Sequence, residues 1–508
     1  MKNKSQTYNV ILNSLVGIIS SFIQIILNYI VRIVIVRELG AEINGIHNLF
    51  QNLINVMMLI ETGFSTALIV HLYKPIEEKD ETLTIQILQF YKKIYYIMAA
   101  VFFLASCLIS LFVLDELIVS SIPSNIVKIF FILFVLSFVG NFLTCYKKGI
   151  LYAEQKNRIS IFATMISEIV FRVAQIYVAI KWHNYFVLLI LMIFEKLCAN
   201  AICNIYINKN HKYLKERKVG KINPELKKSI FDMVKPLFIF NLTSTVQQSA
   251  KSIYIGMFMG NVSAVGYIGN YQLVTSAVQM FCGYFGGAYT SSFGNISIDR
   301  DIKRMYYVYS KFAFTLNWLS IFMGATIIVC IKDFIMMTFG KEYVLSLLIV
   351  VLLVIDMLIY LFNIPIVSIQ NALGLHDKDQ KYMEIQAVIA LSLGYFGGKY
   401  FGIYGILIGL ILPQIIFTLI NKGIIVYREV FNKPGLDFIK YLLMESLKTL
   451  IVVIVDYVIC SYIQMNNYLL NFICKGFTSV IVCVICFVII SYKNIFFREY
   501  LNIIQRKR

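Results

Sequence analysis

Residues 343–373 read YVLSLLIVVLLVIDMLIYLFNIPIVSIQNAL, and Asp356 is the only charged residue among them. An α-helix needs about 20 apolar residues to cross the hydrocarbon core of a bilayer. Similar runs recur along all 508 residues, of which 59% are hydrophobic and 15% charged. Soluble domains contain about 45–50% apolar and about 25% charged residues. The sequence therefore predicts an all-α, polytopic membrane protein.

The apolar runs predict about 14 transmembrane helices, joined mostly by short loops. Their approximate ranges are 9–31, 45–72, 94–118, 126–146, 159–180, 185–207, 236–259, 266–293, 311–331, 343–373, 383–399, 402–427, 441–463 and 468–492. An even number of spans places both termini on one side of the membrane. Most of the 46 Lys and Arg residues fall in loops on that side. Because cytoplasmic loops are enriched in Lys and Arg, we expect both termini in the cytoplasm.

The same distribution accounts for the net charge of +18, and no nucleic-acid partner is expected. The ten Cys residues lie within or at the edges of apolar runs, where a buried thiol behaves as a small hydrophobe. Cys483 and Cys486 have CxxC spacing but no His or acidic neighbour in their apolar run. We therefore expect neither a disulfide framework nor a metal site, and no bound cofactor.

Two short loops recur with a nearly constant offset along the chain. LGAEINGI at 39–46 is matched by MGNVSAVGY at 259–267, which aligns Gly40 with Gly260 and Gly45 with Gly266. YAEQKN at 152–157 is matched by GLHDKD at 374–379 with almost the same offset. Six spans per repeat return the chain to its starting side. The two lobes should therefore be parallel and related by an axis along the membrane normal.

The repeat divides the chain into four regions. We expect a six-helix lobe in 1–207, a basic cytoplasmic linker in 208–235, a second six-helix lobe in 236–428, and two additional helices with a basic tail in 429–508. The linker holds nine Lys or Arg residues. These residues are either a topology signal on a solvated face or an attraction for anionic lipid headgroups.

Three glycine pairs have the GxxxG spacing that lets helix backbones approach closely in lipid. They are Gly283/Gly287, Gly394/Gly398 and Gly405/Gly409. We interpret them as packing features rather than chemistry.

Motifs for catalysis are missing from the sequence. The nearest fragment of a P-loop, Gly397-Gly398-Lys399-Tyr400, lacks the first glycine and the Ser or Thr after the lysine. The sequence contains neither HExxH nor GxSxG, and the longest external loops, around 332–342 and 32–44, are short. Gradient-driven transport therefore fits the sequence better than an enzyme does.

Charged residues within spans are costly and tend to mark a functional site. Arg32 and Lys251 lie at nearly equivalent positions of the first and seventh spans, with an offset close to that of the repeat. Two cations related by the repeat would face each other across the cleft between the lobes. A diphosphate would take bidentate bonds from the Arg and a point-charge contact from the Lys. The alternative is that Arg32 snorkels to the outer surface while Lys251 pairs locally.

Six further charged residues are candidates for the same site: Arg37, Arg172 and Lys196 for substrate binding, and Glu61, Glu168 and Asp356 for coupling or pairing. Glu168 and Arg172 are spaced i, i+4, so they either neutralise each other or belong to the site. Glu61 would bind a coupling cation or pair with a base such as Arg32. The charged residues of the two additional helices, Lys448, Asp456 and Lys475, are expected to pair or to snorkel.

Four short stretches of the sequence resemble the N-terminal lobe of Wzx-type polysaccharide flippases. They are RELGAEINGI at 37–46, ETGF at 61–64, LYKP at 72–75 and YAEQKNR at 152–158. These flippases belong to the multidrug/oligosaccharidyl-lipid/polysaccharide exporter superfamily, which includes the MATE exporters and the lipid II flippase. The resemblance is best in the first lobe, and the repeat and the number of spans extend it to the rest.

The resemblance implies two lobes forming a V around a central cavity, with alternating access by rocking. It implies transport of oligosaccharide on undecaprenyl diphosphate to the outer leaflet of the bacterial cytoplasmic (inner) membrane. It also implies contacts with membrane lipids and other polysaccharide assembly proteins, and coupling to Na⁺ or H⁺. A MATE-like exporter of cationic drugs and a membrane-embedded polysaccharide polymerase are the alternatives.

Overall fold

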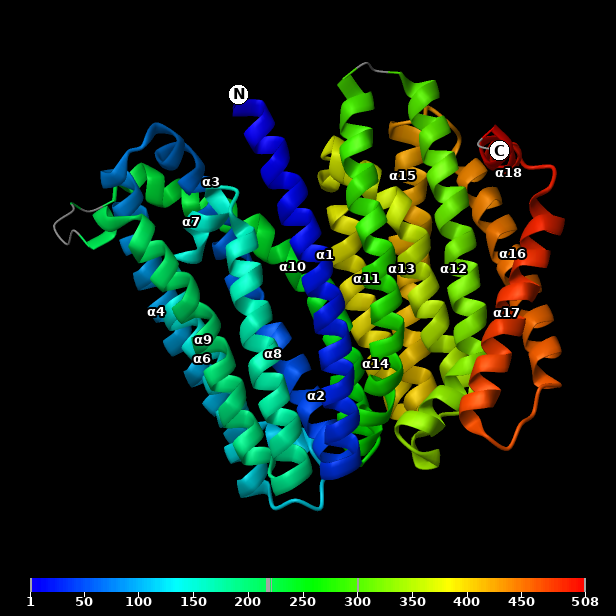
Figure 1. Ribbon diagram of the computed structural model, residues 1–508, viewed down its shortest axis with the longest axis horizontal. Helices are drawn as coiled ribbons and strands as arrows, with labels where there is room; N and C mark the ends of the chain where they lie inside the picture. The colour runs from blue at the N-terminus through cyan, green and yellow to red at the C-terminus, as the bar shows by residue number, and fades with distance from the viewer. Residues whose placement is uncertain (1, 216–219, 221, 299–300, 507–508) are drawn as a thin grey trace. The chain divides into compact units, whose positions relative to one another are not determined.

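The computed structural model describes residues 2–215, 220, 222–298 and 301–506, most of which are helical (Figure 1). No strand occurs among them. Nine helical stretches within these described residues are long and apolar enough to cross a membrane. The prediction of an all-α, multi-pass membrane protein is confirmed, while the exact number of spans stays a prediction.

The chain divides into two compact units, Met1–Gly266 and Tyr267–Arg508. Helix α10 (Pro224–Phe258) belongs to the first unit, where it packs on α2 (Gly40–Met57) and α3 (Leu59–Glu78). The units therefore divide after α10 rather than in the basic segment 208–235. That segment lies partly outside the described residues, Arg217 and Lys218 included. The assignment of lobes from the repeat stays a prediction.

The first unit is a set of long apolar helices with shorter connecting elements. The other elements of this unit are α1 (Lys2–Val34), η1 (Ile35–Leu39), α4 (Glu81–Phe112), α5 (Leu114–Leu117), α6 (Ser124–Cys145), α7 (Lys148–Ala153), α8 (Asn157–Trp182), α9 (Tyr185–Asn210) and η2 (Lys212–Lys215). Helix α9 packs against α6 and α8, and α8 packs in turn against α1. Side-chain caps fix two helix starts, because Asp80 accepts from the Leu83 amide at 2.9 Å and Asn184 from the Val187 amide at 3.2 Å.

The second unit is built around α12 (Ile302–Thr338), which packs against α13, α16 and α17. The other elements are α11 (Ser263–Ile298, which begins in the first unit), η3 (Lys341–Tyr343), α13 (Leu347–Leu373), α14 (His376–Pro413), η4 (Gln414–Asn421), α15 (Lys422–Glu429), α16 (Gly435–Ser461), α17 (Tyr468–Ser491) and α18 (Ile495–Arg506). Phe314, Trp318 and Ile321 of α12 form a buried core with Val452 of α16 and Cys483 of α17. Helix α12 thus connects α16 and α17, the two additional helices of the sequence prediction, to the rest of the second unit.

Helix α14 is two helical arms that fold back on each other at Gly402, whose φ is +60°. A β-carbon on Gly405 would lie 2.1 Å from the carbonyl oxygen of Gly397, and one on Gly409 would lie 2.5 Å from that of Leu393. These contacts pair residues at equal distances before and after the turn, so the arms are antiparallel. Gly405 and Gly409 therefore serve close packing as predicted. A β-carbon on Gly287 would meet nothing within 4 Å, and one on Gly283 would meet only the Tyr360 hydroxyl at 3.7 Å. Among the described residues, the first glycine pair therefore has no close backbone contact.

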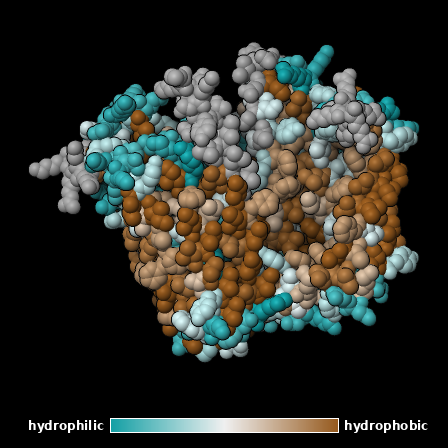
Figure 2. Space-filling model, viewed as in Figure 1, coloured by the Kyte–Doolittle hydropathy of each residue, from teal (hydrophilic) through white to brown (hydrophobic). Residues whose placement is uncertain are grey.

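Hydrophobic side chains cover the middle lengths of the helices on the visible face of each unit, and hydrophilic ones gather at helix ends (Figure 2). Many large apolar residues of both units are exposed, for example Leu104 at 62% and Ile481 at 57%. Exposed apolar surface of this extent is stable in lipid and not in water.

The first pair of repeated loops meets inside the first unit. Gly40 and Gly260, which correspond in the repeat, both have positive φ, +90° and +61°, a conformation that glycine adopts without strain. A β-carbon on Gly45 would lie 2.1 Å from the carbonyl oxygen of Val262. The Asn44 side chain donates a hydrogen bond to the Gly266 carbonyl at 3.3 Å. The two matched loops therefore pack backbone to backbone.

Candidate functional site

Helices α8 and α9 hold a closed polar ring within their apolar contact. Nε of Arg172 lies 3.5 Å from Oε2 of Glu195, and Nη1 of Arg172 donates to the Gln175 side-chain oxygen at 3.1 Å. The Gln175 amide donates to the same Glu195 oxygen at 3.1 Å. Gln175 and Glu195 are both buried. Burying a carboxylate away from water is costly unless it is paired and hydrogen-bonded, and the ring meets both needs.

This ring bears on the two alternatives predicted for Glu168 and Arg172. Glu168 and Arg172 have the spacing of an ion pair on one helix, but the pair observed joins Arg172 to Glu195 on the neighbouring helix. The Glu168 carboxylate accepts a hydrogen bond from Gln24 of α1, and the charge of Arg172 acts on it as well. The contact between α8 and α9 decides the partner, and it is a tertiary contact that spacing within α8 does not report.

Arg32 at the end of α1 faces the same region. The charges of Arg172 and Arg32 both act on His47 of α2. His47 shares a 3.0 Å hydrogen bond with the Tyr185 hydroxyl of α9. The ring of His47 also packs edge-on to Phe134, with centroids 5.3 Å apart. The charges of Arg32 on α1 and Arg172 on α8 thus converge on one imidazole of α2.

Lys196 adds a third cation to this region. Its ammonium lies 6.0 Å from the centre of the Phe138 ring, and its charge acts on Glu168. We call Arg32, Arg172, Lys196, Glu168 and Glu195 the first-unit charge cluster. Three cations and two carboxylates leave one formal positive charge in a region of low dielectric constant. Such a region attracts an anionic group.

The remaining predicted residues lie elsewhere. Arg37 is exposed in η1, and Lys251 is 7% exposed in α10. Asp356 of α13 belongs to the second unit, where it accepts a hydrogen bond from the Gln414 side chain at 3.1 Å. The opposition of Arg32 and Lys251 across a cleft stays a prediction.

Glu61 of α3 borders a cavity of about 350 Å³. The Tyr95 hydroxyl donates to Oε1 of Glu61 at 3.2 Å, and the charge of Lys148 acts on this carboxylate. The rest of the lining is apolar. It consists of Met57 of α2, Phe142 of α6 and several residues of α4, among them Phe102. This arrangement presents one carboxylate to an otherwise apolar space, which suits a cation or a proton rather than a large polar ligand.

Sequence reasoning missed the neutral polar members of the site. Gln175 follows Arg172 by three residues, so the two lie on one face of α8, and this spacing is the signal that points to it. His47 lies two residues beyond the repeated glycine Gly45. For Tyr185 and Tyr95 no pattern in the sequence indicates a role, because their partners come from other helices.

Comparison with known proteins fits this architecture. A model of the family described as polysaccharide biosynthesis protein matches residues 29–348. The structure is similar to the lipid II flippase MurJ in an inward closed conformation, with a TM-score of 0.68, 17% identity, and coverage of 95% of this chain and 99% of that chain. No curated protein matches the sequence.

Transporters of the MATE family are similar as well. An inward-facing multidrug resistance MATE transporter of the MOP superfamily gives a TM-score of 0.64 at 12% identity, covering 78% of this chain and 92% of that chain. A Vibrio cholerae MATE transporter gives 0.55 at 15% identity, covering 82% and 94%. These likenesses establish the fold, and the predicted resemblance to the superfamily is confirmed. Because the family model spans more than half of the sequence, the chain belongs to the polysaccharide biosynthesis protein family and has the fold of the MATE and MurJ transporters.

Proposed function

We propose that this protein flips oligosaccharide linked to undecaprenyl diphosphate from the cytoplasmic to the outer leaflet of a bacterial cytoplasmic membrane. Transport by alternating access, rather than catalysis, is the activity. The observation that carries the proposal is the family match over residues 29–348, which contains the whole first-unit charge cluster. The fold shared with a lipid II flippase supports the same class of substrate.

The charge cluster gives this activity a physical basis. A diphosphate loses its hydration on entering a region of low dielectric constant, where an unpaired charge is prohibitive. Arg32 and Arg172 offer guanidinium forks that match phosphate oxygens, and Lys196 adds a point charge. Glu195 and Gln175 hold Arg172 in place between transport cycles. The oligosaccharide would remain outside this charged region, in the space that opens during rocking.

Glu61 is the residue that we assign to coupling with Na⁺ or H⁺. Its carboxylate borders the 350 Å³ cavity and is oriented by Tyr95. Glu61→Gln keeps the hydrogen bond from Tyr95 and removes the charge. We expect this variant to fold normally and to bind substrate, but to lose the dependence of transport on the ion gradient.

The test is transport of lipid-linked oligosaccharide by the full chain in cells and in vesicles. Arg32→Ala should abolish surface polysaccharide, and the lipid-linked precursor should accumulate on the cytoplasmic leaflet, with normal amounts of protein in the membrane. Lys378→Ala is a matched control, because it removes a cation from an exposed pair with Glu429. Normal surface polysaccharide with Arg32→Ala would overturn the assignment of Arg32.

Two other activities give different results in the same cells. A MATE-like exporter of cationic drugs would change drug resistance and leave polysaccharide intact, and the excess of cations in the cluster argues against it. A polymerase would leave flipping normal and shorten the polymer. Contacts with other polysaccharide assembly proteins would appear as co-purification with the wild-type chain and are part of this proposal.

A further inference from the structure

We infer that the second unit binds one anionic phospholipid in a cavity between α12, α15, α16 and the start of α18. The cavity has a volume of about 470 Å³. Its polar lining includes Lys440, Glu445 and Lys448 of α16 and Asn494, just before α18. This site is separate from the first-unit charge cluster and does not depend on the substrate that the protein transports.

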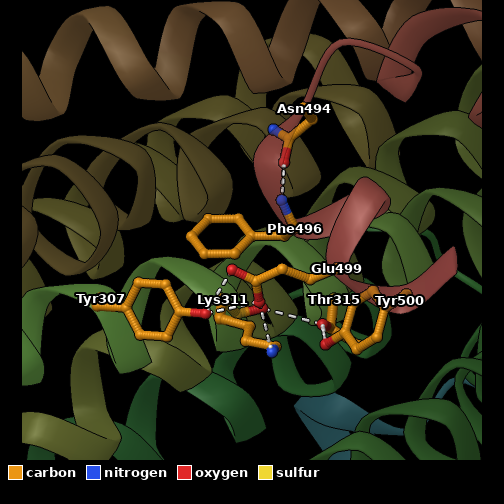
Figure 3. Close-up of polar contacts among 7 residues, drawn as sticks. All are labelled: Tyr307, Lys311, Thr315, Asn494, Phe496, Glu499 and Tyr500. Atoms are coloured by element: carbon orange, nitrogen blue, oxygen red, sulfur yellow. Dashed lines mark hydrogen bonds and ion pairs between the residues drawn. The ribbon is translucent and has the colours of Figure 1, made fainter. Parts of the chain in front are cut away.

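Helix α18 is fixed onto α12 by polar contacts (Figure 3), and Asn494 and Phe496 at its start line the cavity. Tyr307 and Lys311 of α12 bind the two carboxylate oxygens of Glu499, at 2.6 Å from the Tyr307 hydroxyl to Oε1 and 2.8 Å from Lys311 Nζ to Oε2. One turn further along α12, the Thr315 hydroxyl lies 2.8 Å from that of Tyr500. Residues spaced by four share a helix face, so α12 presents a continuous polar stripe to α18.

The start of α18 is held at the cavity itself. The Asn494 side chain accepts a hydrogen bond from the Phe496 amide at 2.9 Å, which caps the helix. Phe496 packs on Phe314 of α12 with ring centres 5.9 Å apart, and Phe497 is 8% exposed in the α12–α17 core. Arg498 and Leu501 remain exposed. A short helix with one apolar and one polar face, at the end of a bundle, suits the membrane interface.

Charge at this end of the unit favours an anionic headgroup. The Lys448 ammonium lies 2.7 Å from Glu445, and an ammonium has three donors, so further acceptors fit. Lys440 is exposed and forms no ion pair with any residue that the structure describes. Lys433 lies 3.9 Å from the centre of the Tyr306 ring, which lines the cavity. Against these three cations stand Glu445, which lines the cavity, and Asp437 of α16, whose charge acts on the lining residue Tyr427.

The rest of the lining fits the acyl part of a lipid. Phe314, Met444 and Phe496 provide apolar walls, and Tyr309 and Tyr427 add rings. Basic cavities between transmembrane helices on the cytoplasmic side bind anionic lipid headgroups. Lys303 and Arg304 at the start of α12 and Lys493 beside α18 mark this end as the one expected to face the cytoplasm. A soluble anion would use the cations but not the apolar walls.

The experiment counts lipids retained by the full chain, purified from bilayers of equal phosphatidylglycerol and phosphatidylcholine, by native mass spectrometry. We expect one phosphatidylglycerol per chain, retained about fivefold over phosphatidylcholine or more. Lys440→Ala should reduce that preference about fivefold, and Met444→Trp should reduce retention of both lipids by filling the cavity. Lys493→Ala, an exposed cation outside the lining, is the matched control and should change nothing.

Equal retention of the two lipids by the wild type would overturn the inference, as would wild-type retention in Lys440→Ala. An excess of inorganic phosphate should leave retention unchanged, because phosphate lacks acyl chains. Displacement of the lipid by phosphate would identify a soluble-anion site and contradict the proposal. Lys440 is exposed, so this variant should keep the wild-type thermal unfolding midpoint, which is checked in parallel.

Discussion

A β-carbon on Gly266 would lie 2.9 Å from the backbone nitrogen of Gly45, although the two glycines belong to different copies of the internal repeat. The repeat aligns these same positions, so the two copies of one motif have become each other's packing partner. Only glycine fits at either position, because the contact is between backbones.

Gly45→Ala and Gly266→Ala should therefore each destabilise the first unit. The added methyl group meets backbone atoms that do not move as a side chain does, and overpacking of this kind costs about 1–3 kcal/mol. The measurement is the thermal unfolding midpoint of the purified chain in detergent. Gly287→Ala is the control, since its β-carbon would meet nothing within 4 Å. A Gly45→Ala midpoint equal to that of Gly287→Ala would contradict the packing described.

Arg172→Ala should destabilise the protein by about 3–5 kcal/mol, because it leaves the buried Glu195 carboxylate without its cation. Replacing both residues, Arg172→Met with Glu195→Met, should recover part of that loss, because no charge is then buried unpaired although Gln175 loses both partners. Flipping should remain absent in the double variant if Arg172 binds the diphosphate. Unfolding midpoints and surface polysaccharide, measured on the same membranes, separate the two effects. If the double variant transports at the wild-type rate, Arg172 does not bind the diphosphate and its pair with Glu195 is only structural.

A second buried pair joins α12 to α17. The Lys475 ammonium and the Asn471 amide each donate to the Asp333 carboxylate at 2.8 Å, and Asp333 is 2% exposed. Lys475→Ala should lower the unfolding midpoint strongly and loosen α17, because the carboxylate keeps only a neutral partner. Lys332→Ala changes an exposed neighbour on α12 and should have no such effect. Hydrogen exchange of α17 amides provides the readout, and unchanged protection would count against this pair.

The docking of α18 should weaken in acid. Hydrogen bonds from Lys311 and Tyr307 hold the pKa of the Glu499 carboxyl below its ordinary value. A lowered pKa means that the ionised carboxylate stabilises the docked helix. This stabilisation is complete at a pH above the ordinary glutamate pKa of about 4.3. The contribution is lost as the pH falls through the lowered pKa. Amide protection of residues 495–502 should follow this change in the wild type, and Glu499→Gln should remove the dependence on pH.

Sequence patterns predicted the parts of this fold that depend on local chemistry. Long apolar runs such as 343–373 locate the helices, and the break between 399 and 402 coincides with the turn at Gly402. The repeated glycines Gly45 and Gly266 also proved to share a structural role. Each of these features follows from residue type and spacing along one stretch of chain.

Tertiary contacts account for what the sequence did not predict. The spacing of Glu168 and Arg172 allowed an ion pair within α8, and packing of α9 on α8 added Glu195, whose carboxylate lies 3.5 Å from Arg172. The packing of α10 on α2 and α3 is likewise a tertiary contact, which a repeat offset does not contain. Gln175 is electrically neutral, so a search for intramembrane charges passes over it.

The turn at Gly402 has a consequence for how the chain enters the membrane. Its two arms reverse direction with no polar loop between them, and the tip residues Tyr400 and Phe401 are 69% and 73% exposed, as aromatic side chains at a membrane interface are. Lys399 is the one charged residue at the tip, so neither arm ends in a hydrophilic segment on which insertion could pause. The pair should therefore leave the ribosome-bound insertion machinery as one helical hairpin, and a reporter spliced into the tip should disturb assembly of both arms together.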